Sequence, residues 1–476
     1  MIYQVPEHIG KDKVFIVHKS EIDRRLDPHY NSPSYCELWH KLMSITVKIT
    51  SLKKECVSIF SGITPKSGAD AYTTVGGIPF LRSGDFSETN EIDFSQLLQL
   101  KEEVHNTLMS NSKLKNGDLL VAIVGATIGK VGVYRYNHEA NINQAICAVR
   151  LRDTLNPYYV QAFLQTNLGQ KIIERTKRPV ARANINLEEV GNLPIPLLSI
   201  SKQRDIVEIM KDGINAKKAK EVEAQQLLDS IDNYLLKELG ITIPKIKTGL
   251  ANRMFIVQKK NLKGRYTPGI YKDAITLYST IYDNIPLSHL AYINPDTRLP
   301  YQNKEMQISF VPMESVNEIY AEITEHKDCI IEDSKGFTRF QEGDLLWAKI
   351  TPCMENGKSA IAEDLTNGYG CGSTEFHVIR PKNEDLLIEY IHSLLHMKFV
   401  RQTAKLYFGG SAGQQRVAVD FLENFNVPFP SCEKQKEIID HIADIRTRAK
   451  ILQTEGKAIL ENAKHKIEQI IIGNGK

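Results

Sequence analysis

The clearest periodic pattern of apolar residues lies near the end of the chain, where small or apolar side chains recur at alternating steps of four and three. This spacing is that of a coiled-coil seam and predicts a long helix. A weaker stripe over residues 202–239 has steps mostly of four and is interrupted between Ile214 and Val222. The two sets are Ile438, Ile442, Ile445, Ala449, Leu452, Gly456, Ile459 and Ala463, and Ile206, Met210, Ile214, Val222, Leu227, Ile231, Leu235 and Leu239.

The length of the weaker stripe indicates what the two helices do. Its 38 residues would extend over roughly 57 Å, more than a domain of this size needs to cover its own core. We therefore expect the two helices to pack antiparallel as a rod between two globular domains, although most amphipathic helices pack on their own domain. An extended Pro-x-Pro segment precedes each helix, and Ser201 and Ser431 are the expected N-caps.

A second pattern is a repeat of the first half of the chain in the second half. The triplet Phe-Ile-Val recurs after 240 residues (255 − 15), and strand-like and helix-like patterns follow in the same order. Each half therefore mixes strands with helices, and we expect an α+β fold with two similar domains. The paired segments are 78–88 and 308–318, 116–125 and 342–351, 145–151 and 375–381, and the helical stretches 158–174 and 386–403.

The total length supports this division, because 476 residues exceed what one hydrophobic core usually serves. The expected boundaries are a first domain at 1–198, its helix at 199–245, a second domain at 246–430 and its helix at 431–476.

Composition adds little about the partner. The net charge of +3 is too small to establish nucleic-acid binding. No apolar run is long enough to cross a membrane, and the first residues lack the apolar core of a secretion signal, so we expect a cytoplasmic protein. The seven cysteines form no C-x-x-C pair, so neither a metal site nor a disulfide framework is expected.

The doubled order of domain, Pro-x-Pro segment and glutamine-bearing helix resembles the specificity subunit of type I restriction-modification enzymes. The stretch RRLDPHYNSP from Arg24 is similar to the start of one branch of that family, and the Gly-Asp-Leu-Leu strands look like those in its target-recognition domains. The family usually has Glu-Gln at the start of each helix, whereas this chain has Lys202-Gln203 and Lys434-Gln435.

The resemblance implies two target-recognition domains that each read one half of a split, asymmetric site in double-stranded DNA. Two methyltransferase subunits would dock on the helices, and separate restriction motor subunits would join for cleavage. The chain itself would be non-catalytic and would need no cofactor. Two alternatives stay open: a specificity subunit that serves a different methylase or nuclease system, and a scaffold whose two domains bind proteins.

Basic and amide side chains in turn-rich segments are the candidates for DNA contact. The stretch 171–182 has five basic residues against one acid, which is typical of phosphate binding, and Arg, Asn and Gln can pair bidentately with base edges. Its counterpart at 400–416 differs in sequence, so we expect two different half-sites. The candidates are Lys66, Arg82, Lys130, Lys177, Arg178, Arg182, Asn184, Arg339, Lys349, Lys358, Arg401, Lys405, Gln414, Gln415 and Arg416.

Three short motifs could suggest catalysis, and each departs from the pattern that the chemistry needs. NPYY at Asn156 lacks the second proline of an adenine-methylase motif, and we interpret it as a turn into a helix. FGGSAG at Phe408 follows a helical stretch instead of a strand. TPCMENGKS at Thr351 lacks the first glycine of a phosphate-binding loop.

Overall fold

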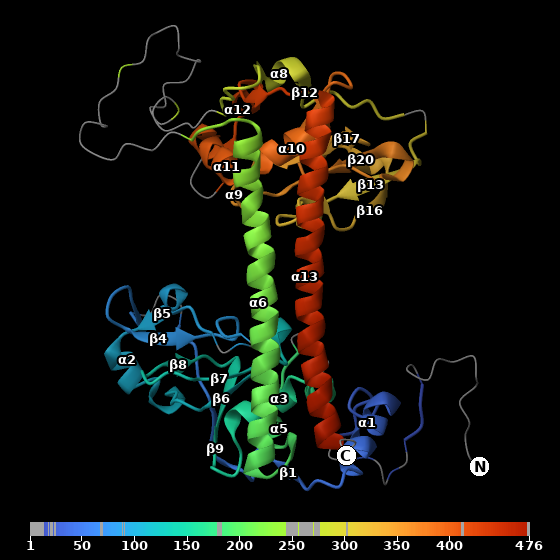
Figure 1. Ribbon diagram of the computed structural model, residues 1–476. Helices are drawn as coiled ribbons and strands as arrows, with labels where there is room; N and C mark the ends of the chain where they lie inside the picture. The colour runs from blue at the N-terminus through green and yellow to red at the C-terminus, as the bar shows by residue number, and fades with distance from the viewer. Residues whose placement is uncertain are drawn as a thin grey trace. The chain divides into compact units, whose positions relative to one another are not determined.

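The computed structural model describes residues 14–17, 19, 22, 25–66, 70–87, 89, 91–178, 183–243, 256, 270, 277–300, 303–410 and 414–473. The chain forms two compact units: unit 1 is Met1–Glu221 with Gln453–Lys476, and unit 2 is Val222–Leu452. The helices α6 (Ile200–Glu238) and α13 (Cys432–Ile472) each contribute to both units (Figure 1). The second copy of the Phe-Ile-Val triplet lies almost entirely outside the described residues.

Unit 1 contains two four-stranded sheets. The first has the order β2-β9-β6-β7 and is antiparallel, and the second has the order β3-β5-β4-β8 with β4 parallel to β8. The elements are α1 (Pro33–Met43), β1 (Ile49–Ser51), β2 (Cys56–Ser61), β3 (Tyr72–Thr73), β4 (Ile78–Leu81), β5 (Leu98–Leu100), α2 (Glu102–Asn106), β6 (Leu119–Ala122), β7 (Val131–Val133), β8 (Asn141–Ile142), β9 (Ile146–Leu151), α3 (Pro157–Leu164), α4 (Asn167–Thr176), α5 (Leu187–Gly191) and β10 (Pro194–Pro196).

Unit 2 repeats the first of these sheets, whereas its second sheet shares the parallel pair but has its fourth strand at the opposite edge. Its first sheet has the order β12-β21-β18-β19, and its second has the order β16-β13-β20-β17 with β13 parallel to β20. The elements are β11 (Asn284–Pro286), α8 (Leu287–Leu290), β12 (Ala291–Ile293), β13 (Gln307–Val311), β14 (Val316–Asn317), β15 (Glu322–Ile323), β16 (Lys327–Ile330), β17 (Thr338–Gln341), β18 (Leu345–Ala348), α9 (Cys353–Asn356), β19 (Ser359–Ile361), β20 (Tyr369–Gly372), β21 (Phe376–Pro381), α10 (Ile388–His396), α11 (Lys398–Ala404), β22 (Phe408–Gly409), β23 (Arg416–Val417), α12 (Val419–Glu423) and β24 (Asn426–Pro428).

Burial on both faces of the central strand β6 explains why its sequence is a continuous apolar run and does not alternate with polar residues. Leu119 and Val121 belong to the core that α3 and α4 cover, whereas Leu120 and Ala122 belong to the core of the second sheet. Successive side chains of a strand point to opposite faces, and here both faces are buried. Strand β18 has the same two-sided burial in unit 2.

The repeat extends to single hydrogen bonds at the start of each long helix. The buried Gln203 side chain accepts from the backbone N–H of Asn156 at 2.8 Å and donates to two carbonyl oxygens at 3.0 and 2.9 Å. Gln435 accepts from the backbone N–H of Leu387 at 3.0 Å and donates to two carbonyl oxygens at 2.9 and 3.1 Å. The same contact therefore joins each helix to the strand-rich part of its unit.

A buried ion pair is also repeated. Arg150 on β9 donates to the Asp118 carboxylate from Nε and Nη2 at 2.8 and 2.7 Å. Arg380 on β21 donates to the Asp344 carboxylate from the same two nitrogens, each at 2.7 Å. Both carboxylates are 1% exposed. The aspartates belong to the Gly-Asp turns that the sequence repeat identified, so these turns are part of the core.

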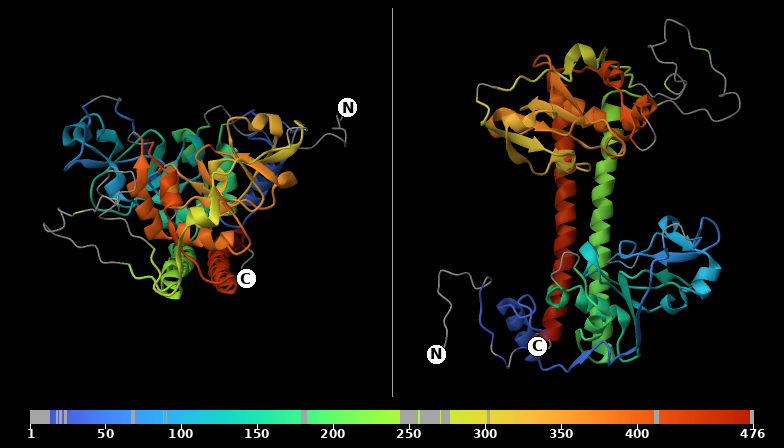
Figure 2. Two further views of the ribbon diagram at one scale, coloured as in Figure 1. Left: turned by 90° about the horizontal axis from the view of Figure 1, so that it is seen from above. Right: turned by 180° about the vertical axis from the view of Figure 1, so that it is seen from behind.

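The two long helices pack against each other in both units, as the seam pattern predicts (Figures 1 and 2). In unit 1 a Cβ added at Gly213 would lie 2.8 Å from the Cβ of Ala463. In unit 2 Lys434 Nζ lies 2.7 Å from Glu238 Oε2. In unit 1, Gly213 of α6 faces Ala463 of α13, and the later residue Lys217 faces the earlier residue Gly456. The two helices therefore pack antiparallel.

Some local predictions are confirmed and others are wrong. Val222, expected in the seam, is 48% exposed, and Ala224 is buried near that position instead. The N-cap of α6 is Ser199, since α6 begins at Ile200, whereas Ser431 does precede α13 as predicted. Each predicted helical stretch is two helices, α3 with α4 and α10 with α11.

The turn interpretation of NPYY is confirmed. Asn156 caps α3 by accepting from the backbone N–H of Tyr158, and Pro157 is the first residue of that helix. A proline is tolerated there because the first N–H groups of a helix have no partner within it.

Candidate nucleic-acid interface

In unit 1 the segment after the first basic stretch returns to the turn that follows β6. Asn184 forms an isolated β-bridge with Val124. The backbone N–H groups of Gly125 and Ile185 complete the pairing on either side, with hydrogen bonds of 3.1 and 3.0 Å. The pairing fixes Asn184, whose side chain is exposed, just beyond the end of the central strand β6.

Unit 2 has the same pairing at the turn that follows β18. Arg416 forms an isolated β-bridge with Ile350, and the backbone N–H groups of Thr351 and Val417 donate across it at 3.0 and 2.9 Å. Arg416 and Asn184 therefore occupy equivalent positions of the two domains.

Arg416 belongs to a group of charged side chains. Its Nε and Nη2 atoms lie 2.8 and 2.7 Å from the two carboxylate oxygens of Glu375. The backbone N–H of Lys349 donates to the Glu375 carbonyl oxygen at 2.9 Å. We call Lys349, Glu375 and Arg416 the charged trio. The hydrogen bond from Arg416 holds the pKa of Glu375 below its usual range, and burial lowers the pKa of Lys349.

The equivalent residues of unit 1 carry no charge. The backbone N–H of Ile123 donates to the Ala145 carbonyl oxygen at 2.9 Å, which is the counterpart of the bond from Lys349 to Glu375. The neutral trio is therefore Ile123, Ala145 and Asn184. The same backbone geometry carries one charged and one neutral set of side chains, and of the neutral set Ile123 is buried in the core.

The turn after β18 is braced by two further candidates. Arg401 donates to the carbonyl oxygens of His396 and Glu355 at 3.0 and 2.5 Å, and burial lowers the pKa of Arg401. Lys405 Nζ lies 2.5 Å from Glu355 Oε2 and is 47% exposed. Arg401 thus supports the turn, whereas Lys405 lies nearer its surface.

Two of the predicted lysines are structural counterparts. The carbonyl oxygens of Lys130 and Lys358 accept from the backbone N–H groups of Ala122 and Ala348 at 2.9 and 3.0 Å. The Lys130 side chain is exposed, whereas Lys358 Nζ donates to the Met313 carbonyl oxygen at 3.0 Å. Both lysines end the turn that carries its domain's trio.

Three candidates lie away from these turns. Lys66 is exposed beyond β2, and Arg82 is ion-paired with Asp85 at 3.2 Å after β4. Arg339 is half-buried in β17, opposite Cys371.

The remaining candidates lie in the two loops. Lys177 pairs with Glu174 at 3.2 Å, and Arg182 lies outside the described residues. Gln414 is exposed, and its carbonyl oxygen accepts from Arg416 Nη1 at 3.1 Å, whereas Gln415 is half-buried.

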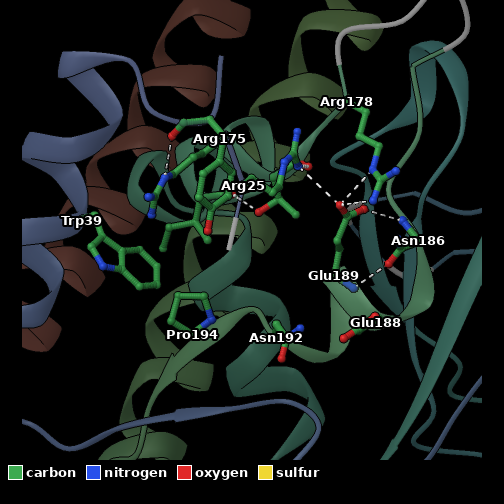
Figure 3. Close-up of a pocket in the computed structure, with 12 residues that line it drawn as sticks. Arg25, Trp39, Arg175, Arg178, Asn186, Glu188, Glu189, Asn192 and Pro194 are labelled. Carbon is green, nitrogen blue, oxygen red and sulfur yellow. Dashed lines mark hydrogen bonds and ion pairs between the residues drawn. The ribbon is translucent and has the colours of Figure 1, made fainter. Parts of the chain in front are cut away.

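Arg178 lines a cavity of about 250 Å³ between the N-terminal segment, α4 and α5 (Figure 3). Arg178 and Arg25 converge on the carboxylate of Glu189, at 2.9 and 3.4 Å. The same carboxylate accepts from the backbone N–H of Asn186 in a capping box that begins α5. Glu189 therefore fixes the base of the first basic loop.

Arg175 closes one side of this cavity. Its guanidinium lies 4.1 Å from the ring centre of Tyr30 and 4.5 Å from that of Trp39, and its Nε donates to the Tyr30 carbonyl oxygen at 3.0 Å. Cation–π contacts of this kind stabilise a desolvated guanidinium. Arg175, which is 3% exposed, attaches the N-terminal segment and α1 to α4.

Sequence reasoning missed Glu375 and Glu189, the carboxylates that orient Arg416 and Arg178. A signal for Glu375 was present, because the repeat aligns Glu375 with Ala145, a charge opposite a methyl group. The spacing of Asn186 and Glu189 is that of a capping box, but nothing in the sequence indicates the ion pairs of Glu189 with Arg25 and Arg178. The described residues include no cluster of metal-ligand type and no helix able to cross a membrane.

Comparison with known proteins gives one consistent result. A family model described as the type I restriction modification DNA specificity domain matches residues 53–229 and 296–462. The EcoEI and EcoAI type I restriction enzyme specificity subunits of Escherichia coli are each 34% identical, over 189 and 192 residues. These alignments cover 39% of this chain and 31% of each relative, so the chain matches less than a third of their length.

A solved chain from a type I R-M system covers 90% of this chain and 96% of its own length, with 12% identity and a TM-score of 0.47. The two matched ranges of the family model lie in the two halves of the repeat and together exceed half of the chain. The chain belongs to the type I restriction-modification DNA specificity family.

Proposed function

We propose that this chain is the sequence-specific DNA-binding specificity subunit of a type I restriction-modification complex. Each domain binds one half of a split, asymmetric site in double-stranded DNA. The domains are those expected from the sequence, 1–198 and 246–430, and the helical segments 199–245 and 431–476 carry the partner subunits. The chain supplies recognition in the cytoplasm and performs no catalysis itself.

One observation carries this proposal: the two domains share the backbone of the turns after β6 and β18 but differ in the side chain at the exposed end of that pairing, Asn184 in one domain and Arg416 in the other. A protein that bound two copies of one ligand would have no need of this difference. A bipartite, asymmetric DNA site requires two similar modules with different side chains at the reading positions.

The partners are two methyltransferase subunits and, for cleavage, restriction motor subunits. The family membership supports this assignment, as do the many charged residues on the exposed faces of α6 and α13. The DNA-contacting set is proposed to be the candidate residues of the two loops and turns, with Arg401 acting as a brace.

Selection of bound duplexes from a random library tests the proposal. The purified chain, with its methyltransferase subunits, should enrich two short sequences separated by a fixed spacer, and adenines within them should become methylated. A protein scaffold would enrich no split sequence. Enrichment of a single continuous site, or of two identical halves, would contradict the proposal.

A further inference from the structure

The hydrogen bonds of Arg416 leave a specific part of its guanidinium available. A guanidinium has five N–H donors. Nε and Nη2 bond to Glu375, and Nη1 bonds to the Gln414 carbonyl oxygen at 3.1 Å. The bonds among the described residues thus leave one N–H on each of the two terminal nitrogens. The side chain is 42% exposed, so these donors can reach a ligand.

Two donors on neighbouring nitrogens match a specific feature of DNA. In the major groove only guanine presents two acceptors side by side, O6 and N7, and arginine pairs with them bidentately. Adenine presents one acceptor and one donor at the same place, which a side-chain amide matches. Asn184, at the equivalent position of unit 1, carries such an amide.

We propose that Arg416 reads a guanine and Asn184 an adenine, each at the equivalent position of its own half-site. This inference rests on the proposed function and deepens it, since it assigns one base pair of each half-site to a named residue.

Glu375 favours a base edge over a phosphate as the ligand of Arg416. The carboxylate offsets one of the two positive charges of the trio and is bonded to Arg416 itself, so Arg416 attracts a phosphate less than a lone cation does. It also holds the guanidinium in one orientation, which lowers the entropy lost on binding and restricts the geometry of the contact. In unit 1 Ala145 stands where unit 2 has Glu375, so no carboxylate is present at that position, and the neighbouring Arg178, which bridges to Asn184, is itself paired with Glu189.

The exposed Lys130 supplies a contrast within the same protein. No ion pair of Lys130 is present among the described residues, and its side chain is compatible with a phosphate contact. Replacing it by glutamine should weaken binding to all sequences alike and reduce the slope of log affinity against log salt by about 0.9.

The test compares Arg416→Asn, Asn184→Arg and Lys130→Gln in the duplex selection, using the full chain with its methyltransferase subunits. Arg416→Asn should lower discrimination at one G·C pair of one half-site by roughly 5- to 150-fold. It should leave the other half-site and the salt slope unchanged. Asn184→Arg should change the base preference at only one position, an A·T pair of the other half-site.

Glu375→Gln provides a variant that keeps Arg416 and removes the fixed carboxylate, and it should weaken discrimination at the same G·C pair. The inference is overturned if Arg416→Asn leaves every base preference intact, or if it behaves as Lys130→Gln does. If the unmodified protein selects no split site, the proposed function fails. If it selects one that the variants do not change, only the base assignment fails.

Discussion

Replacing Gln435 by leucine should destabilise unit 2 by about 3 to 5 kcal/mol. The side chain is fully buried and makes hydrogen bonds of 3.0, 2.9 and 3.1 Å to the backbone of Leu387, Asp385 and Pro430. Each bond is worth about 1 kcal/mol, and the three backbone groups that lose their partner add a desolvation cost. Leucine fills a similar volume, so the loss of polar contacts dominates.

The two tryptophans allow this effect to be measured in one unit. Trp39 lies in unit 1 and the buried Trp347 in unit 2, so Trp39→Phe leaves a single reporter of unit 2. In that background Gln435→Leu should lower the urea midpoint by about 1 to 2 M. Gln203→Leu, the matched change in unit 1, should affect this reporter less. The reasoning would be refuted if Gln435→Leu shifted the urea midpoint by an amount that corresponds to less than about 0.5 kcal/mol of unfolding free energy.

Three further outcomes are expected. Gly213→Leu should lower the thermal midpoint measured by circular dichroism at a cost of about 1 to 3 kcal/mol, because its Cβ would meet Ala463 at 2.8 Å; Gly213→Ala should cost less. Asp344→Asn should cost about 3 to 5 kcal/mol in urea unfolding, since Arg380 would lose its buried carboxylate; an unchanged midpoint would show the pair to be dispensable. Burial lowers the pKa of His392, as it does for His396 and His377, so below pH 6.5 only the unfolded chain binds these protons. As the pH decreases through this range, His392 alone should lower the unfolding free energy by up to about 1.4 kcal/mol per pH unit, and His392→Gln should remove this share of the dependence.

The fold could be predicted to the level of domains and long helices because those features depend on local periodicity. The seam residues Ile438, Ile442, Ile445 and Ala449 are buried as expected. The error at Val222 arises in the weaker stripe, because the seam runs from Gly213 through Lys217 and Lys220, which face Gly456, to the buried Ala224. These steps of four and three pass over Val222.

The candidate site could be predicted only in part. Basic loops are visible in one sequence, but the pairing of Asn184 with Val124 and of Arg416 with Ile350 joins segments that no local pattern connects. The ion partner Glu375 is distant from Arg416 in sequence and is invisible to charge counting. The lysines at Lys130 and Lys358 were predicted separately, and only the structure makes them counterparts.

The division between repeated and variable features follows a physical rule. The contacts that join each helix to its unit are fully buried and hydrogen-bonded, so a change in one partner leaves a buried group unsatisfied. The trios lie just beyond the ends of the central strands β6 and β18, and their members are at least partly exposed except Ile123, which belongs to the core. Alanine can therefore change to glutamate, or asparagine to arginine, while the backbone bonds of 2.9 to 3.1 Å around them persist. A duplicated domain can therefore acquire a new half-site without losing its fold. Exchanging only Asn184 with Arg416 and Ala145 with Glu375, which leaves the buried Ile123 in place, should transfer base preference at that position while moving the unfolding midpoint of either unit by less than Gln435→Leu does.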